Sequence, residues 1–560
     1  MTYPSSDPSR PPAWPHCARG AGVTDPVGCR GVRVARRTAC LAHLEETDRA
    51  AHLAALSPGA DIDHRGTSFS TSLLDRLLDA LRDQVTRHPR LGNARFNGAR
   101  FTGDANFSGA DLTGRASFDD AVFTGGARFG GADFTETARF GGAVFEGEAR
   151  FREAAFSGGA RFDGTVFRGN ALFLGAVFEA DTTFGEARFE ATSELGPLLC
   201  DGAVDLDGAV FGAPVTLEIA ARAVSLRRAR WAPKAALRLR YASLDLSDAV
   251  LEYPLVVTAH GTPFVSPHLD DPLSETALAG RDHGVRLTSV SGVDTALLAL
   301  HDIDLSGCRF AGAVHLDGLR VDGWCTFATA PTGWWRRFPW RWSRRRALIE
   351  EHHWRARSAR RAHGWTALPA DAPRDTPELR PAALAALYRQ LRKSLEDGKN
   401  EPGAADFYFG ECEMRRHDRD GTFLVERLLL TVHWALSGYG LRAVRALAWL
   451  ALAMLVTVTL LMAFGLPEES PKQEITGTVP AGGGKVTFEM DKADPENPRG
   501  DTFTGERLEK ALNVTLNSVV FRSSGQDLTT AGGYIEMASR VSEPVLLGLA
   551  ALAVRNRVKR

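Results

Sequence analysis

Eighteen positions between residues 94 and 189 carry a large apolar residue, at steps that alternate between five and six residues. The residue two positions before each is alanine, or threonine at Thr165 and Thr182, so the true period is eleven. A repeat of fixed period constrains the architecture of a chain more than any local pattern does. The positions are Phe96, Phe101, Phe107, Leu112, Phe118, Phe123, Phe129, Phe134, Phe140, Phe145, Phe151, Phe156, Phe162, Phe167, Phe173, Phe178, Phe184 and Phe189.

Steps of five and six fit neither a helix, which needs apolar residues three and four apart, nor a half-buried strand, which needs them two apart. They fit a chain that turns a corner between successive phenylalanines, with glycines such as Gly98 and Gly109 at the corners. Four short sides then make one coil of about 22 residues, and main-chain hydrogen bonds would stack such coils roughly 4.8 Å apart. The spacing therefore predicts a β-helix with a phenylalanine core.

Three blocks within this repeat carry a family resemblance. Ala94-Arg95-Phe96, Ala110-Asp111-Leu112 and Ala127-Arg128-Phe129 resemble the pentapeptide-repeat family, whose members form right-handed quadrilateral β-helices. The extra residue in alternate units departs from a strict five-residue repeat. Each buried phenylalanine contributes roughly 1.5–3 kcal/mol, but one coil cannot cover its own rings, so we expect stability to arise from neighbouring coils.

A looser repeat follows, with a period of 20 residues. We expect it to extend the β-helix to about Phe327, interrupted by a surface excursion over 258–284 that is rich in Pro, His and Asp. The apolar positions are Leu206, Phe211 and Leu217, then Leu226, Trp231 and Leu237, then Leu246, Leu251 and Val257, and later Leu305, Phe310 and Leu316.

The C-terminal part contains apolar segments of membrane-spanning length. Ala446–Leu466 has 21 residues without a charge, close to the ~20 that span the hydrocarbon layer. A second span is expected at Tyr534–Val554, although it carries charged residues, and Arg507–Phe521 is predicted to form a helix between the two. Basic residues before the first span and at the C-terminus favour the cytoplasmic side. The predicted location is the cell membrane, with two spans, both termini cytoplasmic and the acidic loop 467–506 outside.

Residues 441–560 loosely resemble the pore module of two-helix ion channels. No Thr-Val-Gly-Tyr-Gly filter follows the helix between the spans, where the sequence begins Arg522-Ser523-Ser524-Gly525. A Gly-Tyr-Gly does occur at residues 438–440, but it precedes the first span, and we interpret it as a turn that ends a helix. Potassium selectivity is therefore not predicted.

Three cysteines and a histidine near the N-terminus could bind a metal. Cys17, Cys29, Cys40 and His43 are spaced C-x11-C-x10-C-x2-H, and thiolates with an imidazole suit tetrahedral zinc. The alternative is a set of buried free thiols, and His16 could replace one ligand. An amphipathic helix is predicted from Ser72 to Val85, where it would cover the exposed edge of the first coil.

The segment Trp334–Arg361 contains ten arginines, five tryptophans and two acidic residues. Interleaved basic and aromatic residues suit anionic lipid headgroups or the phosphates and bases of nucleic acid. The nearby membrane segments favour the lipid surface, and a solvated insertion is the remaining alternative. We do not expect nucleic acid as a partner.

Two helices broken near Gly398 and Pro402 are predicted in residues 381–416. This stretch, together with Trp434 and Ser437–Arg442, is similar to the helical connector of bacterial membrane-bound pentapeptide-repeat proteins. The expected order is an N-terminal Cys/His module with a capping helix (1–90), the regular β-helix (91–195), the degenerate β-helix (196–330), a basic linker (331–375), a helical connector (376–440) and a membrane domain (441–560).

No catalytic motif is present: the sequence lacks a Gly-x-Ser-x-Gly elbow, a phosphate-binding Gly-x4-Gly-Lys-Ser/Thr loop and a His-Glu-x-x-His pair. We expect a non-enzymatic, membrane-anchored scaffold that binds a protein partner on the cytoplasmic side, with self-association left open. The alternative is a channel or sensor-like pore regulated by the β-helix. DNA mimicry is disfavoured, because residues 91–190 hold ten Arg against fourteen Asp or Glu. The only cofactor expected is structural zinc.

Overall fold

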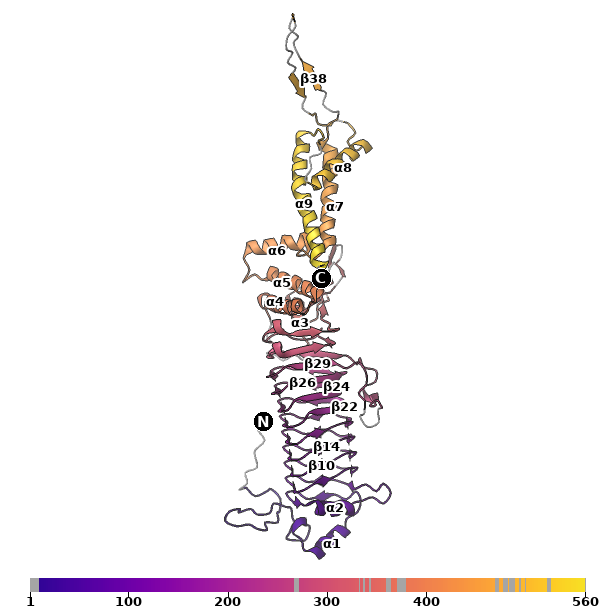
Figure 1. Cartoon of the computed structure of the whole chain (residues 1–560), viewed down its shortest axis with the longest axis vertical. Coiled ribbons are helices and arrows are strands. Elements are labelled where there is room, and N and C mark those ends of the chain that lie inside the picture. Colours follow the sequence, from indigo (N-terminus) through magenta and orange to yellow (C-terminus); the bar gives the residue numbers. More distant parts are fainter. Residues whose placement is uncertain are drawn as a thin grey trace. The chain divides into compact units, whose positions relative to one another are not determined.

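The computed structural model (Figure 1) describes residues 10–558, apart from 266–270, 332, 336–337, 342–343, 359–363, 370–378, 469–472, 477–481, 483–488, 493–494, 499 and 521–524. Two compact units divide the chain. The first comprises Met1–Leu379 with Gln390–Lys399, and the second Arg380–Arg389 with Asn400–Arg560. Each unit is described by itself.

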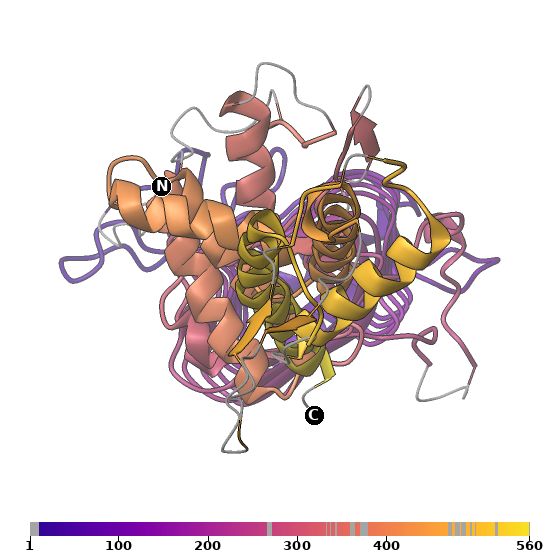
Figure 2. The same cartoon turned by 90° about the horizontal axis from the view of Figure 1, so that it is seen from above.

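The first unit is dominated by a parallel β-solenoid whose strands are two residues long. Strands β6 (Ala105–Asn106), β10 (Ala127–Arg128), β14 (Ala149–Arg150) and β18 (Ala171–Leu172) pair in parallel along one side, each 22 residues after the last. The coils superpose when the solenoid is viewed along its axis (Figure 2). Four strands in every 22 residues confirm the predicted four-sided β-helix.

The other three sides follow the same register. One consists of β5 (Arg100–Phe101), β9 (Val122–Phe123), β13 (Val144–Phe145), β17 (Val166–Phe167) and β21 (Arg188–Phe189). A second consists of β4 (Ala94–Arg95), β8 (Ala116–Ser117), β12 (Ala138–Arg139), β16 (Ala160–Arg161) and β20 (Thr182–Thr183). The third consists of β3 (Arg90–Leu91), β7 (Asp111–Leu112), β11 (Asp133–Phe134), β15 (Ala155–Phe156) and β19 (Val177–Phe178).

The phenylalanines form continuous ring stacks inside this solenoid. Phe107 and Phe129 lie 5.0 Å apart between ring centroids with planes 2° apart, and Phe129 and Phe151 lie 5.0 Å apart with planes 3° apart. Every ladder residue is buried, as is the Ala or Thr two positions before it. Neighbouring stacks meet edge to face, as between Phe129 and Phe140, a geometry that aromatic pairs favour.

The looser repeat continues the solenoid with longer strands. The ring of Phe211 stacks on the indole of Trp231 at 4.2 Å, and Leu217 pairs with Leu237, which confirms the 20-residue period. The strands are β22 (Glu194–Asp205), β23 (Val210–Phe211), β24 (Val215–Ser225), β25 (Arg230–Trp231), β26 (Ala235–Arg240), β27 (Ser243–Asp245), β28 (Val250–Leu251), β29 (Leu255–Ala259), β30 (Val285–Ser289), β31 (Leu298–His301), β32 (Ile303–Asp304) and β33 (Arg320–Asp322).

The excursion over 258–284 has mostly exposed or half-buried residues in its described part, and two side chains anchor it to the solenoid wall. Phe264 and Leu278 are buried in one cluster with Leu199 and Ala220. Within the same region Arg240 donates to Glu275 at 2.8 Å, and both side chains are at least nine-tenths buried. Tyr241 also donates its hydroxyl to that carboxylate.

The helix that covers the first coil is α2 (Thr71–Ala80), shorter than the predicted 72–85. Ser70 is its N-cap and accepts from the backbone N–H of Leu73, and the chain leaves the helix after Ala80 for a turn. Four leucines of α2 are buried. The helix is an insertion within a further coil that begins at β1 (Ile62–Asp63) and β2 (Ser68–Phe69), where the Phe69 ring stacks on Phe101 at 5.4 Å.

Helices make up most of the described part of the second unit. Its elements are the first part of α4 (Pro381–Asp397), α5 (Glu401–His417), α6 (Leu424–Ser437), α7 (Ala443–Leu460) with a π-helical turn (Leu461–Gly465), α8 (Gly505–Val519) and α9 (Thr530–Val558), with a small hairpin of β38 (Gln473–Thr476) and β39 (Glu489–Lys492). Thr457 contacts Glu543 and Gly465 contacts Gly532, so α7 and α9 are antiparallel.

Candidate functional site

The structure brings the four predicted metal-ligating side chains together. The ligand atoms of Cys17, Cys29, Cys40 and His43 all lie within 4.8 Å of one another. The Cys29 and Cys40 sulfurs are 3.7 Å apart, and His43 Nδ1 lies 3.5 Å from the sulfurs of both Cys17 and Cys40. Around a tetrahedral zinc with ordinary bond lengths, sulfurs would be about 3.8 Å apart and sulfur and nitrogen about 3.6 Å apart. The cluster can therefore hold a metal ion.

Short local structures hold these ligands in place. Cys40 precedes a 3-10 turn, Leu41–His43, which brings its sulfur to the imidazole three residues later. Cys17 and Cys29 lie on two facing segments, where the N–H of Cys17 donates to the carbonyl of Gly31 at 2.8 Å. A Cβ at Gly31 would lie 2.8 Å from the Cys40 sulfur. Only glycine leaves room for the cluster to close at this point.

The electrostatics of the cluster favour one thiolate. A hydrogen bond from Cys40 is the largest influence on Cys29 and lowers the pKa of its thiol to about 5. The same bond raises the pKa of the Cys40 thiol well above its usual range. A bound cation would favour the deprotonated form of all three thiols. His16 lies outside the cluster and forms a bridge with Val32, so the structure gives no support to it as a replacement ligand.

Part of the basic segment 334–361 points inward rather than toward a ligand surface. Arg345 pairs with Glu351 at 2.5 Å, and Arg355 pairs with the same carboxylate at 2.6 Å. Arg345 and Glu351 are buried at the start of helix α3 (Ile349–Ser358). The interpretation of the whole segment as a surface patch was therefore wrong for these two arginines, because both pair with the buried carboxylate of Glu351. The side chains of 332–343 lie outside the described residues.

A hydrogen-bonded hub joins α5 to the turn before α7 in the second unit. The Tyr439 hydroxyl donates to Glu413 at 2.9 Å and accepts from Arg416 at 3.1 Å. Burial and the adjacent Glu413 carboxylate raise the pKa of Tyr439 above its usual range. Gly438, Tyr439 and Gly440 all have positive φ. The predicted helix-ending turn is confirmed, and the tyrosine points into the connector.

The helices α7, α8 and α9 have an unusual distribution of side chains. Leu508, Leu512 and Leu516 of α8 are exposed, whereas Ala511, Thr515 and Ser518 on its other face are buried. The helix Ala443–Gly465 has the length and composition of a membrane span with 28% of its apolar window buried, and Thr530–Arg555 likewise with 22%. The predicted spans thus correspond to helices that are apolar mainly on their outer surfaces.

The two ends of this helical module carry opposite charge. Arg445 lies at the start of α7 and donates to the carbonyl of Trp434. At the other end Arg507 donates to the carbonyls of Met462 and Leu466 at 2.8 Å each, which satisfies the last turn of the span. That end is otherwise rich in acidic side chains: Glu468, Asp501, Glu506 and Asp527. The stretch 521–524, considered above for a filter, lies outside the described residues.

Comparison with known families identifies the repeat. Residues 90–133, 107–155 and 140–188 match the family described as Pentapeptide repeats (9 copies). The chain therefore contains a pentapeptide-repeat β-solenoid, a fold that is typically a non-catalytic scaffold. No curated protein and no solved structure matches the chain.

Proposed function

We propose that the chain is a non-enzymatic scaffold, anchored in the cell membrane by α7 and α9, whose pentapeptide-repeat solenoid binds a protein partner on the cytoplasmic side. The observation that carries the membrane assignment is the outward-facing apolar surface of α7, α8 and α9. A soluble helix buries its leucines and exposes its polar side, whereas α8 exposes its leucine stripe and buries Thr515 and Ser518. In a bilayer this distribution is expected, because small and polar residues pack between helices.

Helix α6 supports the same assignment. It lies crosswise to α7 (Figures 1 and 2), and one of its faces is an exposed apolar stripe next to the spans with which it packs. Such a helix suits the plane of the membrane interface. The stripe consists of Leu424, Val425, Leu428, Leu429 and Val432, preceded by Phe423.

The proposed topology places both termini in the cytoplasm and the loop after α7 outside. Arg442 and Arg445 at the start of α7, and Arg555 at the end of α9, lie at one end of the antiparallel pair. The positive-inside rule favours that end as cytoplasmic. A reporter fused after Arg560 should report the cytoplasm, and one inserted at 482 the outside.

The protein should also remain in the membrane after alkaline carbonate washing. Release by the wash would refute anchoring.

The solenoid walls supply the proposed partner surface, because its ring stacks are buried and only outward side chains can be recognised. Arg128 and Arg150 project from one wall in successive coils and pair with the acidic neighbours Asp104 and Glu148. Co-purification from detergent-solubilised membranes tests partner binding. A partner recovered with the wild type should be lost after Arg128→Glu with Arg150→Glu and retained after Arg238→Glu, which lies in the later coils. Equal recovery would contradict the use of this wall.

We also propose that Cys17, Cys29, Cys40 and His43 bind structural zinc. When bound, zinc would cross-link the facing segments at Cys17 and Cys29 to the turn at Cys40, and so stabilise the N-terminal module. Metal analysis of the full chain should give about one equivalent of zinc, lost in Cys29→Ser and kept in Cys325→Ser, a cysteine outside the cluster. A metal-free, folded wild-type protein would refute this assignment.

A pore is the second candidate function. The order of span, short helix and span, with α8 packed against both α7 and α9, favours it. Reconstituted protein should then conduct ions, and deletion of 505–560 should abolish the current. Silent bilayers with correctly inserted protein would leave the scaffold as the function.

A further inference from the structure

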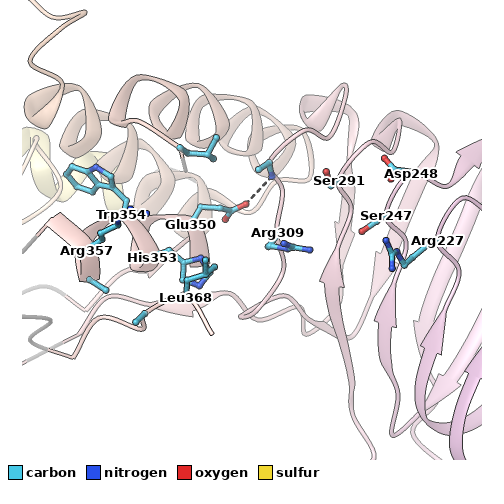
Figure 3. A pocket seen from close by; sticks show the side chains of 14 residues that line it. Arg227, Ser247, Asp248, Ser291, Arg309, Glu350, His353, Trp354, Arg357 and Leu368 are labelled. Atoms are coloured by element: carbon cyan, nitrogen blue, oxygen red, sulfur yellow. Dashed lines mark hydrogen bonds between the residues drawn. The ribbon is translucent and has the colours of Figure 1, made fainter. Parts of the chain in front are cut away.

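A cavity of about 480 Å³ lies in the first unit, where α3 and residues 367–368 face the wall of the solenoid (Figure 3). Corners of successive coils form one side, with Arg227, Ser247, Ser291 and Arg309. Trp354 and Leu368 contribute to the opposite side. The size is in the range of sites that bind small molecules, which are mostly apolar with a few fixed polar groups.

Two arginines line the solenoid side of this cavity. Within the described part of the chain, Arg227 and Arg309 form no ion pair with a carboxylate, although Asp248 and Glu350 also line the cavity. Several wall arginines outside the cavity do form ion pairs: Arg230 with Glu252 at 2.7 Å, Arg238 with Glu218 at 2.9 Å and Arg286 with Asp304 at 3.0 Å. The cavity therefore keeps guanidinium groups that can receive an anion.

Glu350 gives a second, independent sign of a ligand. One oxygen, Oε1, accepts from the backbone N–H groups of Phe310 at 2.5 Å and Ala311 at 3.0 Å (Figure 3). The other, Oε2, is buried and has no hydrogen-bond partner among the described residues. A buried polar atom without a partner is costly. Desolvation raises the pKa of this carboxyl, which favours the protonated form, and that form can donate a hydrogen bond.

We propose that this cavity binds a small anion with an aromatic or apolar part, of the class of phosphate monoesters and carboxylates. Arg227 and Arg309 bind the anionic group, for which guanidinium is well suited. The Trp354 indole and the Leu368 side chain pack against the apolar part. This inference is independent of membrane anchoring, of zinc and of a protein partner.

Calorimetry on the full-length protein in detergent, with phenyl phosphate as the probe, tests the proposal. Two further ligands are measured separately: inorganic phosphate represents the anionic part of the probe, and benzyl alcohol represents its aromatic part. Phenyl phosphate should bind at least about tenfold more tightly than either half, because both parts of the cavity are used. Absence of phenyl phosphate binding at millimolar concentration would overturn the proposal.

Variants separate this cavity from general attraction to a basic surface. Arg227→Ala and Arg309→Ala should each weaken binding by about tenfold or more. Arg188→Ala is the matched control, since it is an exposed arginine of the solenoid outside the cavity, and it should bind as the wild type does. Equal affinity in all three variants would refute the site.

Glu350→Gln gives a test of opposite sign. The amide oxygen can still accept from Phe310 and Ala311, while the amide N–H₂ supplies at every pH the donor that the carboxyl group supplies only when it is protonated. Phenyl phosphate should therefore bind several-fold more tightly to this variant. Weaker binding of phenyl phosphate by a Glu350→Gln protein with unchanged circular dichroism would contradict the proposal that an anion occupies this cavity.

Discussion

The solenoid and the helices α7, α8 and α9 differ in which side chains they bury. In the solenoid the largest side chains are innermost, as at Phe129, and arginines such as Arg128 lie outside in ion pairs. In α8 of the helical module the leucines Leu508, Leu512 and Leu516 are exposed, and Ala511, Thr515 and Ser518 are buried. The proposed membrane anchoring would account for this difference, because the two regions would then face two different solvents. Water drives the phenylalanines together, whereas lipid gives leucines no reason to leave the surface.

The largest effect is expected from removing one ring of the solenoid. Phe129→Ala should lower the free energy of unfolding by about 3–5 kcal/mol, because the ring is fully buried between Phe107 and Phe151 and a cavity would remain. Hydrogen-exchange protection of the adjacent coils measures the loss. Phe129→Leu should cost less than half as much. A loss below about 1 kcal/mol for the alanine variant would show that the coils do not depend on one another.

The next effect is a pH dependence that belongs to the solenoid alone. His64 lies in the ring stack of the first coil, against Phe69 and Phe96, and is buried. Desolvation lowers its pKa to about 4, with a smaller influence from His52. Above pH ~6.5 the residue is neutral in both states. As the pH falls toward 4 only the unfolded chain takes up the proton, so stability should fall by up to about 3 kcal/mol.

His64→Phe provides the control for this dependence. The variant places a further ring in the stack and should remove most of the loss between pH 6.5 and 4, as followed by urea unfolding. An unchanged pH profile would show that other groups, such as carboxylates on the solenoid wall, cause the acid sensitivity.

A smaller effect is expected where two helices of the module touch. A Cβ at Gly532 would lie 2.3 Å from the carbonyl oxygen of Gly465, so Gly532→Ala should force α7 and α9 apart and cost about 1–3 kcal/mol. Gly533→Ala is its matched control, because a Cβ there would meet open space. Thermal stability in detergent distinguishes the two variants. Equal melting temperatures would argue against the close helix contact.

The smallest effect is predicted for a leucine that faces outward. Leu512→Ala should change stability in a bilayer by less than about 0.5 kcal/mol, because the side chain contacts lipid whether or not the helices are packed. Ala511→Leu, one residue earlier on the buried face, should cost about 1–3 kcal/mol. A large loss at Leu512 would mean that this face packs against protein, as it would in an oligomer.

The sequence predicts the solenoid well where its period is unbroken. Every position of the repeat from Phe96 to Phe189 lies in the core. A step of five or six residues corresponds to one side of the coil, so each step brings the next large side chain to the inside. The first coil was missed, since α2 is inserted between Phe69 and Leu91 and interrupts the spacing. His64 made this coil harder still to predict, because the search for the repeat relied on large apolar residues and histidine is not one of them.

Interactions between distant residues were harder to foresee. The pairing of Arg240 with Glu275 fixes part of the 258–284 excursion, and nothing in the spacing of the two residues indicates it. The anion site proposed beside α3 depends on which arginines form no ion pair, a property of the fold rather than of the local sequence. The Cys/His cluster was predictable in membership, but the approach of Cys40 to Gly31 required the structure.

The register of the solenoid fixes how its length depends on the number of coils. Each coil repeats after 22 residues, and adjacent coils lie about 4.8 Å apart. Gain or loss of one coil by duplication or deletion would change the length by that amount and leave every wall facing the same way. Gain or loss of eleven residues would also keep the phenylalanines in phase, but would turn all later coils by half a revolution. Duplication or deletion can therefore change the length of the solenoid and the direction of its later walls separately.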